Sequence, residues 1–277
     1  MSLARNLLAG AAALSMAIVA GPANAQISGD VVRIGVLTDM NSIYADINGM
    51  GAVEAARMAV EDFGGTVLGK KIEVVYADTQ NKADIGMSVG GRWFDVDGVD
   101  MIAGASSSAV SLAIQTLVGS KNKVFLASDP ASSDITGKLC NANTIHWVYD
   151  TYALANGTGS AVVQSGGDTW FFLTADYAFG YALERDVGAV VTKSGGTVLA
   201  SVRHPLNTSD FSSFILQAQA SKSKIVGLAN AGGDTINSIK QAAEFGVVKG
   251  GQKLAGLLVF ISDIHSLGLD AAQGLQL

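Results

Sequence analysis

Short β-branched runs alternate with helical patterns along almost the whole chain. The first run, Val31–Leu37, precedes a polar loop and then a segment with Val53, Ala56, Val60 and Phe63 on one face, near the 3.6-residue period of an α-helix. Similar pairs of strand and helix follow at similar spacing. Regular alternation of this kind implies a parallel sheet with helices on both faces. The sequence therefore predicts an α/β fold.

The same rhythm divides the chain into two units. It restarts near Thr144, after strands predicted at 31–37, 71–76, 101–104 and 124–127. The second unit has predicted strands at 170–174, 197–202, 225–228 and 254–260, separated by helices at 180–193, 211–220 and 235–245. We predict two doubly wound parallel-sheet lobes, lobe 1 at residues 26–148 and lobe 2 at 149–270. Ligands of such sheets bind at the carboxyl ends of the strands, so the cleft between the lobes is the expected site.

The first 25 residues have the pattern of a secretory signal. A positive charge at Arg5 is followed by an apolar run, Leu7–Ala20, and then by the small residues of Ala23–Ala25. A membrane span needs about 20 apolar residues, which this run does not supply. We predict a signal peptide at residues 1–25 and a mature protein that begins at Gln26 and works outside the cytoplasm. A buried N-terminal helix is the alternative.

The last residues resemble a strand that has just begun. Residues 271–277 carry no recognisable cap, turn or closing helix. We expect the C-terminal part to be missing, with 271–277 starting a crossing back to lobe 1. This interpretation predicts an exposed apolar surface on lobe 1 and a dangling C-terminal segment. A C-terminal edge strand is the alternative.

Charge and motif content argue against several function classes. The net charge is −6 and no basic run occurs, which disfavours nucleic acid as a partner. Cys140 is the single cysteine, so no internal disulfide forms. His146, His204 and His265 lack the spacing of a zinc site, and neither a Gly-x-Ser-x-Gly elbow nor a phosphate-binding loop is present. We expect no enzymatic activity, no cofactor and no metal; an extracytoplasmic hydrolase is the weaker alternative.

Two hydroxyl-rich loops follow predicted strands of lobe 1. Gly104–Ser108 joins a strand to a helix, with Ser108 at or near the helix start, and Ser128–Asp134 follows the next strand. Ser108 has two interpretations: it caps the helix, or it holds an anion at the positive helix end. Because both loops lie at the carboxyl ends of parallel strands, they converge on one crevice, which favours a carboxylate site.

Several segments together resemble the leucine/isoleucine/valine-binding family, the type I periplasmic substrate-binding proteins of ABC transporters. They follow the family's order from about Val31 to Gly274, and the first loop, with Asp39 and Tyr44, resembles a subgroup that binds aromatic and other organic acids. The segments are Ile34–Asp39, Gly104–Ser108 followed by Ala113, Ser128–Thr136, Asp176–Gly180 and Lys240–Gly246.

The resemblance implies ligand-binding roles in both lobes. In the family, a serine and the loop after the next strand hold the ligand's carboxylate, and aromatic residues of lobe 2 form a wall. Here a serine replaces the family's threonine in that loop. The matching positions are Ser108, Pro130, Ala131, Ser132, Tyr44, Tyr177, Phe179, Asn230 and Ala231.

One departure concerns the ligand's amino group. Branched-chain amino-acid binders have an acid after the strand that matches 254–260, whereas Leu257–Phe260 is apolar here and the nearest acid is Asp263. An unpaired ammonium in a closed cleft is costly. The sequence favours a ligand without an α-amino group, unless Asp263 or Asp129 takes this role.

The resemblance implies a monomeric solute-binding protein. It would capture a small carboxylate (an aromatic or branched-chain acid, or an amino acid) by hinge closure and deliver it to permease subunits in the inner membrane. The alternative is the ligand-sensing domain of a receptor or of an amide-responsive regulator.

Overall fold

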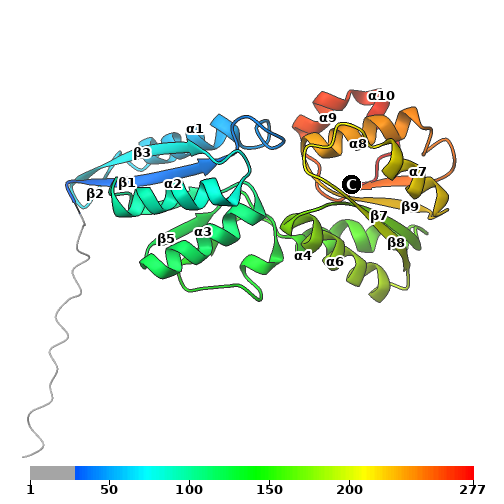
Figure 1. The fold of residues 1–277 in the computed structure, drawn as a ribbon, viewed down its shortest axis with the longest axis horizontal. Helices are drawn as coiled ribbons and strands as arrows, with labels where there is room; N and C mark the ends of the chain where they lie inside the picture. Colours follow the sequence, from blue (N-terminus) through cyan, green and yellow to red (C-terminus); the bar gives the residue numbers. More distant parts are fainter. Residues whose placement is uncertain (1–28) are drawn as a thin grey trace, which may run out of the picture.

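The computed structural model describes residues 29–277, which form two α/β lobes (Figure 1). The predicted signal peptide at 1–25 lies outside the described residues. Lobe 1 comes first in the chain, and α4 (Thr151–Leu154) begins lobe 2 at the junction (Figure 1). The predicted α/β fold with two parallel-dominated lobes is confirmed.

Lobe 1 contains a six-stranded sheet in the order β2-β3-β1-β4-β5-β6. Neighbouring strands are parallel except β2 and β3, which are antiparallel. The strands are β1 (Val31–Thr38), β2 (Thr66–Val67), β3 (Lys70–Asp78), β4 (Met101–Gly104), β5 (Val124–Ala127) and β6 (Thr144–His146). The helices are α1 (Gly49–Asp62), α2 (Ala83–Asp95) and α3 (Ser108–Lys121), with a 3₁₀ turn at Ser133–Ile135.

Lobe 2 contains a four-stranded parallel sheet in the order β10-β9-β7-β8. Its strands are β7 (Thr169–Ala175), β8 (Thr197–His204), β9 (Ile225–Ala229) and β10 (Lys253–Gly256). A π-helical turn at Ala155–Gly159 connects α4 to α5 (Ser160–Gln164). The other helices are α6 (Ala178–Lys193), α7 (Ser212–Ala220), α8 (Gly233–Glu244), α9 (Ile261–Leu267) and α10 (Leu269–Ala272).

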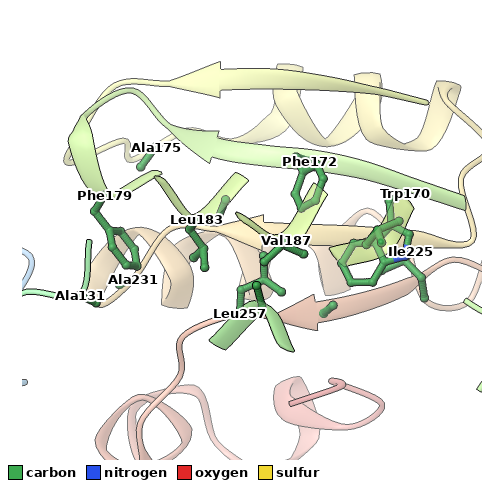
Figure 2. Packing of buried hydrophobic residues seen from close by; sticks show 14 of the residues in the cluster. Ala131, Trp170, Phe172, Ala175, Phe179, Leu183, Val187, Ile225, Ala231 and Leu257 are labelled. Atoms are coloured by element: carbon green, nitrogen blue, oxygen red, sulfur yellow. The ribbon is translucent and has the colours of Figure 1, made fainter. Parts of the chain in front are cut away.

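Strand β7 is buried on both faces and lies inside the lobe 2 sheet. Trp170 and Phe172 pack in one cluster with Val187 of α6 (Figure 2). Phe171 and Leu173 point to the other face and pack in a second cluster with residues of α7 and α8. A continuous apolar run is typical of such a doubly covered parallel strand. This packing fixes the position of the carboxyl end of β7. The segment with the predicted aromatic residues Tyr177 and Phe179 follows directly.

The two faces of the lobe 1 sheet differ in how they are covered. On one face, Ile102 and Phe125 pack with Ile114 of α3 in a buried cluster that also includes residues of α2. On the other face, Met101 and Leu126 line an apolar groove of about 320 Å³ beside α1. The apolar surface that the sequence predicted on lobe 1 is therefore present.

The C-terminal segment differs from the sequence-based prediction. The Gln276 N–H donates to the Leu254 carbonyl (2.9 Å), and the Gly256 N–H donates to the Gln276 carbonyl (2.8 Å). This short parallel pairing occupies backbone groups along β10, which would otherwise be an edge strand. The prediction of a dangling segment was wrong. The predicted strand at 254–260 is also shorter than expected, because β10 ends at Gly256 and residues 257–260 form a loop.

Candidate ligand-binding cleft

A pocket lies between the two lobes, beyond the carboxyl ends of several strands. Its free volume is about 30 Å³, on the order of two water molecules. Residues of both lobes surround it: Tyr44, Ile47, Asn48, Ser106, Ser108, Asp129 and Ala131 from lobe 1, and Tyr149, Tyr177, Phe179, Ala231, Leu258 and Phe260 from the junction and lobe 2. Of the nine site residues predicted from the sequence, six line this pocket and three lie behind it.

The loop between β4 and α3 has an unusual backbone that places hydroxyl groups at the pocket. Gly104 has φ of +90°, and a Cβ there would lie 2.5 Å from the Leu37 carbonyl oxygen, so only glycine fits. Ala105 also has positive φ, +64°. The Ser111 hydroxyl donates to the Ala105 carbonyl (2.5 Å), which fastens the loop from the following helix.

Ser108 is the first residue of α3 and lines the pocket. The residue at the cap position is Ser107, and no side-chain capping hydrogen bond forms there. The Ser108 hydroxyl accepts a hydrogen bond from the Ser132 N–H (3.2 Å), which leaves its proton free to be donated. The first N–H groups of a helix also have no acceptor within the helix. Capping therefore does not account for Ser108, and its role as part of an anion site stays a prediction.

The second loop contributes Ala131 to the pocket surface, but not Ser132 or Pro130. The Ser132 side chain is fully buried and accepts a hydrogen bond from the Asp134 N–H (3.3 Å), which caps the 3₁₀ turn. The Pro130 carbonyl lies 2.6 Å from Nε2 of His146. Both residues support the loop from behind, and Ser132 reaches Ser108 through its backbone N–H.

Aromatic side chains from the two lobes meet at the pocket. The ring centres of Tyr177 and Phe179 are 6.0 Å apart, and the hydroxyl of Tyr177 is hydrogen-bonded to the hydroxyl of Tyr44 across the cleft. The backbone N–H of Tyr44 donates to the Asp39 carboxylate (3.0 Å), which holds the first loop. Figure 2 shows Phe179 beside Ala131 and Ala231, so the apolar core of lobe 2 continues into the cleft.

Asn230 does not line the pocket. It is fully buried in lobe 2, where its amide oxygen accepts from the Thr235 hydroxyl (2.7 Å) and its nitrogen lies 3.2 Å from Nε2 of His204. The loop that follows it contacts lobe 1 through the backbone instead, since the Gly233 N–H donates to the Ile43 carbonyl (3.1 Å). Asn230 thus stabilises the loop that carries Ala231 to the pocket.

Asp129 and Asp263, the two acids that the sequence offered for an ammonium, differ in position. Asp263 lies outside the pocket lining, and its carboxylate accepts from the Phe260 N–H (2.8 Å) at the start of α9. Asp129 lines the pocket, and burial raises its pKa to about 6 against the effect of a hydrogen bond from Ser128. Buried carboxyl groups with a raised pKa mark candidate functional positions.

A second group of contacts joins the lobes beside the pocket. Asp186 of α6 accepts a hydrogen bond from the Ser133 hydroxyl of lobe 1 and one from the Thr151 hydroxyl within lobe 2, both at 2.6 Å. Arg185 donates to the Asp134 carboxylate (2.9 Å) and to the Ser133 hydroxyl (2.8 Å). These contacts hold α6 of lobe 2 against the 3₁₀ turn of lobe 1. No local pattern in the sequence indicated the contacts between the lobes, because their partners are 51–53 residues apart.

Two kinds of feature are absent from residues 29–277. No group of three His, Cys, Asp or Glu side chains is placed to hold a metal ion there. Within the same range, no helix has both the length and the apolar character needed to cross a bilayer.

Comparison with known proteins identifies the family. Residues 31–277 match the periplasmic binding protein family. The chain is 24% identical to Leu/Ile/Val-binding protein homolog 6 of Brucella melitensis, an alignment that covers 87% of this chain and 62% of the relative. The chain therefore spans less than two thirds of the length of that relative.

Solved structures are similar as well. A periplasmic binding protein from Burkholderia mallei is 57% identical, with a TM-score of 0.87 over 89% of this chain and 65% of that one. A solute-binding protein of an ABC transporter from Rhodopseudomonas palustris BisB5, solved with 3,4-dihydroxybenzoic acid, is 24% identical, with a TM-score of 0.77 over 89% of this chain and 68% of that one. The predicted resemblance is confirmed: the chain belongs to the periplasmic binding protein family.

Proposed function

We propose that this protein is the solute-binding component of an ABC uptake transporter and that it captures a small carboxylate between its lobes. It acts in the periplasm, makes and breaks no covalent bond, and delivers the ligand to permease subunits of the inner membrane. The family membership supports this role, as do the names of the relatives, one a Leu/Ile/Val-binding homologue and one a binder of a dihydroxybenzoic acid.

The observation that carries the proposal is the position of the Ser108 hydroxyl. It lies at the first turn of α3, belongs to a residue that lines the pocket, and keeps a proton to donate because its oxygen already accepts from the Ser132 N–H. Hydroxyl donors and unpaired N–H groups at the positive end of a helix stabilise a negative charge. If the carboxylate of a ligand is placed there, the rest of the ligand extends toward Phe179 and Ala231 of lobe 2.

The lobes close because the ligand has a higher affinity for the closed arrangement than for the open one. A ligand held by lobe 1 gains further contacts only when lobe 2 approaches, so it favours the closed arrangement of the lobes. The contacts of Tyr44 with Tyr177 and of Asp186 with Ser133 support this proposal, because each joins a residue of lobe 1 to a residue of lobe 2.

Thermal denaturation with matched ligands tests the carboxylate requirement. Apolar amino acids, branched-chain 2-oxo acids and benzoates are compared with their uncharged amides. At least one carboxylate should raise the melting temperature while its amide does not, because the amide lacks the charge that the helix start stabilises. Equal effects of an acid and its amide, or no effect of any acid, would contradict the proposal.

A further inference from the structure

His204 is a fully buried histidine at the carboxyl end of β8, and each of its ring nitrogens has a neighbour within hydrogen-bond distance. The rings of Phe211 and Phe214 surround it, with centres 4.8 and 6.1 Å from its own. Its Nδ1 lies 2.8 Å from the Pro205 carbonyl oxygen, and its Nε2 lies 3.2 Å from Nδ2 of Asn230. Because a carbonyl only accepts, Nδ1 must carry a proton and donate it.

The contacts of Asn230 leave Nε2 of His204 without a proton. The amide oxygen of Asn230 accepts from the Thr235 hydroxyl (2.7 Å), so the amide atom that faces the imidazole is the nitrogen. An amide nitrogen only donates, and Nε2 is therefore the acceptor. The ring is held neutral, in the tautomer with its proton on Nδ1.

The loop that begins at Asn230 contacts lobe 1. Ala231 lines the pocket. Gly232 has φ of +58°, and a Cβ there would lie 2.2 Å from the Ile43 carbonyl oxygen, so a side chain has no room. The same carbonyl accepts from the Gly233 N–H (3.1 Å). A displacement of Asn230 would move a pocket residue and a contact between the lobes together.

A second proton on the ring would break the contact with Asn230. Nε2–H would point at the amide hydrogens, so two donors would oppose each other. A buried donor without an acceptor costs free energy, and a charged one costs more. Burial lowers the pKa of His204 below its ordinary 6.5, although the hydrogen bond to Pro205 and the charge of Asp176 act in the opposite direction.

No ion pair offsets this cost within residues 29–277. The charged residues on the elements packed around the ring are Asp176 after β7, Asp210 before α7, Asp234 of α8 and, on β8 itself, Arg203. The three carboxylates accept from hydroxyl or backbone N–H donors, and the Arg203 guanidinium lies over the Tyr181 ring (4.5 Å). His204 is bonded to none of them.

We propose that His204 is a positioning residue for ligand capture: while neutral, it holds Asn230, and through Asn230 it holds the loop Ala231–Gly233 against lobe 1. Acidification charges the ring, releases the loop and weakens ligand binding. The effect on binding rests on the function proposed above, whereas the state of the ring and of the loop is measurable without a ligand.

The direction of the pH dependence follows from the lowered pKa of His204. The unfolded chain takes up a proton that the folded protein resists, so the contribution of the neutral ring is complete above pH 6.5. It falls between pH 6.5 and the lower pKa of the folded protein.

Nitrogen NMR of the imidazole rings tests the state of His204 in the wild-type protein. The chain has three histidines, so His146→Gln and His265→Gln identify the His204 signals by elimination. At pH 7.5 the ring should be neutral with its proton on Nδ1, and it should become charged only below pH 6.5. A charged ring at pH 7.5, or one with its proton on Nε2, overturns the proposal without any substitution at His204.

Hydrogen–deuterium exchange tests the loop. His204→Gln keeps an oxygen that can accept from Asn230 but cannot become charged. After correction for the intrinsic effect of pH, exchange of residues 230–233 should accelerate at least tenfold from pH 7.5 to 4.5 in the wild type and less than twofold in His204→Gln. His265→Gln, at an exposed position of α9, should behave as the wild type does. No acceleration in the wild type, or equal acceleration in His204→Gln, overturns the role of His204.

Calorimetry with benzoate, leucine and 4-methyl-2-oxopentanoate extends the test to binding. The affinity of the wild type divided by that of His204→Gln should fall at least fivefold from pH 7.5 to 4.5, because the titration of Asp129 and of the ligand affects both proteins alike. An unchanged ratio overturns the effect on binding and leaves carboxylate capture intact. If none of the three binds the wild type, the proposed function fails, and the NMR and exchange results still decide whether His204 positions the loop.

Discussion

The hydroxyl of Tyr44 in lobe 1 is hydrogen-bonded to the hydroxyl of Tyr177 in lobe 2, so one contact joins the two lobes at the pocket. Both side chains are buried, and burial raises the pKa of Tyr44 and of Tyr177, which keeps both phenols neutral at physiological pH. The same two residues form part of the pocket wall, so closure and the shape of the site are coupled.

Tyr177→Phe should shift the free protein toward a more open arrangement. It removes one neutral hydrogen bond between the lobes, worth about 0.5–1.5 kcal/mol, and leaves the Tyr44 hydroxyl without its partner. Small-angle scattering without ligand should show a larger radius of gyration. Tyr76→Phe, on β3 of lobe 1 and outside the pocket lining, should not change it. Identical scattering of wild type and Tyr177→Phe would show that this contact does not hold the lobes together.

Asp186→Asn should weaken the second contact between the lobes by about 1–2 kcal/mol at pH 7, because two hydroxyls and Arg185 then face a neutral group. Burial alone would raise the pKa of Asp186, but hydrogen bonds from Arg185, Ser133 and Thr151 outweigh it and lower the pKa. A lowered carboxyl pKa gives stability above the unfolded value, near 4, that is lost as pH falls below it.

Urea denaturation at several pH values checks this. The difference between wild type and Asp186→Asn should shrink below about pH 4. Glu54→Gln, which removes an exposed ion pair with Arg57 (3.4 Å), should change stability by less than about 1 kcal/mol. A difference for Asp186→Asn that does not depend on pH would contradict the role of its charge.

Asp129 should have the opposite dependence on pH. Burial raises its pKa from the ordinary 3.8 to about 6, so between these values the folded protein keeps a proton that the unfolded chain releases. The carboxyl group therefore destabilises the fold as pH rises through this window. Its titratable neighbour Tyr149 stays neutral, because burial and then the charges of Asp129 and Asp263 raise its pKa.

The free energy of unfolding of Asp129→Asn should exceed that of the wild type by about 1–3 kcal/mol above pH 6 and should equal it near pH 3.5, measured by urea denaturation. A gain of equal size at both pH values would show that ionisation is not its source.

Gly180→Ala should destabilise the protein by about 2 kcal/mol or more. A Cβ on Gly180 would lie 2.0 Å from the Ala175 carbonyl oxygen. Ala175 ends β7 and Gly180 lies in the first turn of α6, so the pocket residues Tyr177 and Phe179 between them would move. Gly91→Ala in α2 is the matched control, since its Cβ meets no atom within 4 Å and alanine favours the helix by about 0.5–1 kcal/mol. Equal melting temperatures of the two variants would refute the close approach at Gly180.

The fold was largely predictable from local patterns. Strands β4 and β5 were predicted to the residue, because short apolar runs with turns beside them leave little choice. Strand β10 was predicted too long. Leu257–Phe260 is as apolar as a buried strand, but this segment is a loop that contributes Leu258 and Phe260 to the pocket. Periodicity does not distinguish a residue buried in a sheet from one that lines a cleft.

The site was predictable in position more than in side-chain orientation. Ser108, Tyr177 and Phe179 line the pocket, as do Tyr44, Ala131 and Ala231. Ser132 and Asn230 do not line it. The side chain of Ser132 is hydrogen-bonded to the Asp134 N–H of its own loop, and that of Asn230 lies beside His204 of another strand, so neither position follows from sequence spacing. Oδ2 of Asp129 has no hydrogen-bond partner among the described residues, and this too depends on residues far apart in the sequence. Sequence spacing shows which loops meet, and only the packed structure shows which polar atoms remain without a partner.

In the proposed function, the cleft binds a carboxylate through Ser108. Calorimetry with the acid that gives the largest thermal shift, on wild type and on Ser108→Ala, tests this role. Ser120→Ala, at the other end of α3, removes a hydroxyl bonded only to a nearby carbonyl among the described residues and serves as the control. Ser108→Ala should weaken binding by about 1.5–3 kcal/mol, the range for a hydrogen bond to a charged group, while Ser120→Ala binds as the wild type does. Unchanged affinity in Ser108→Ala would contradict the claim.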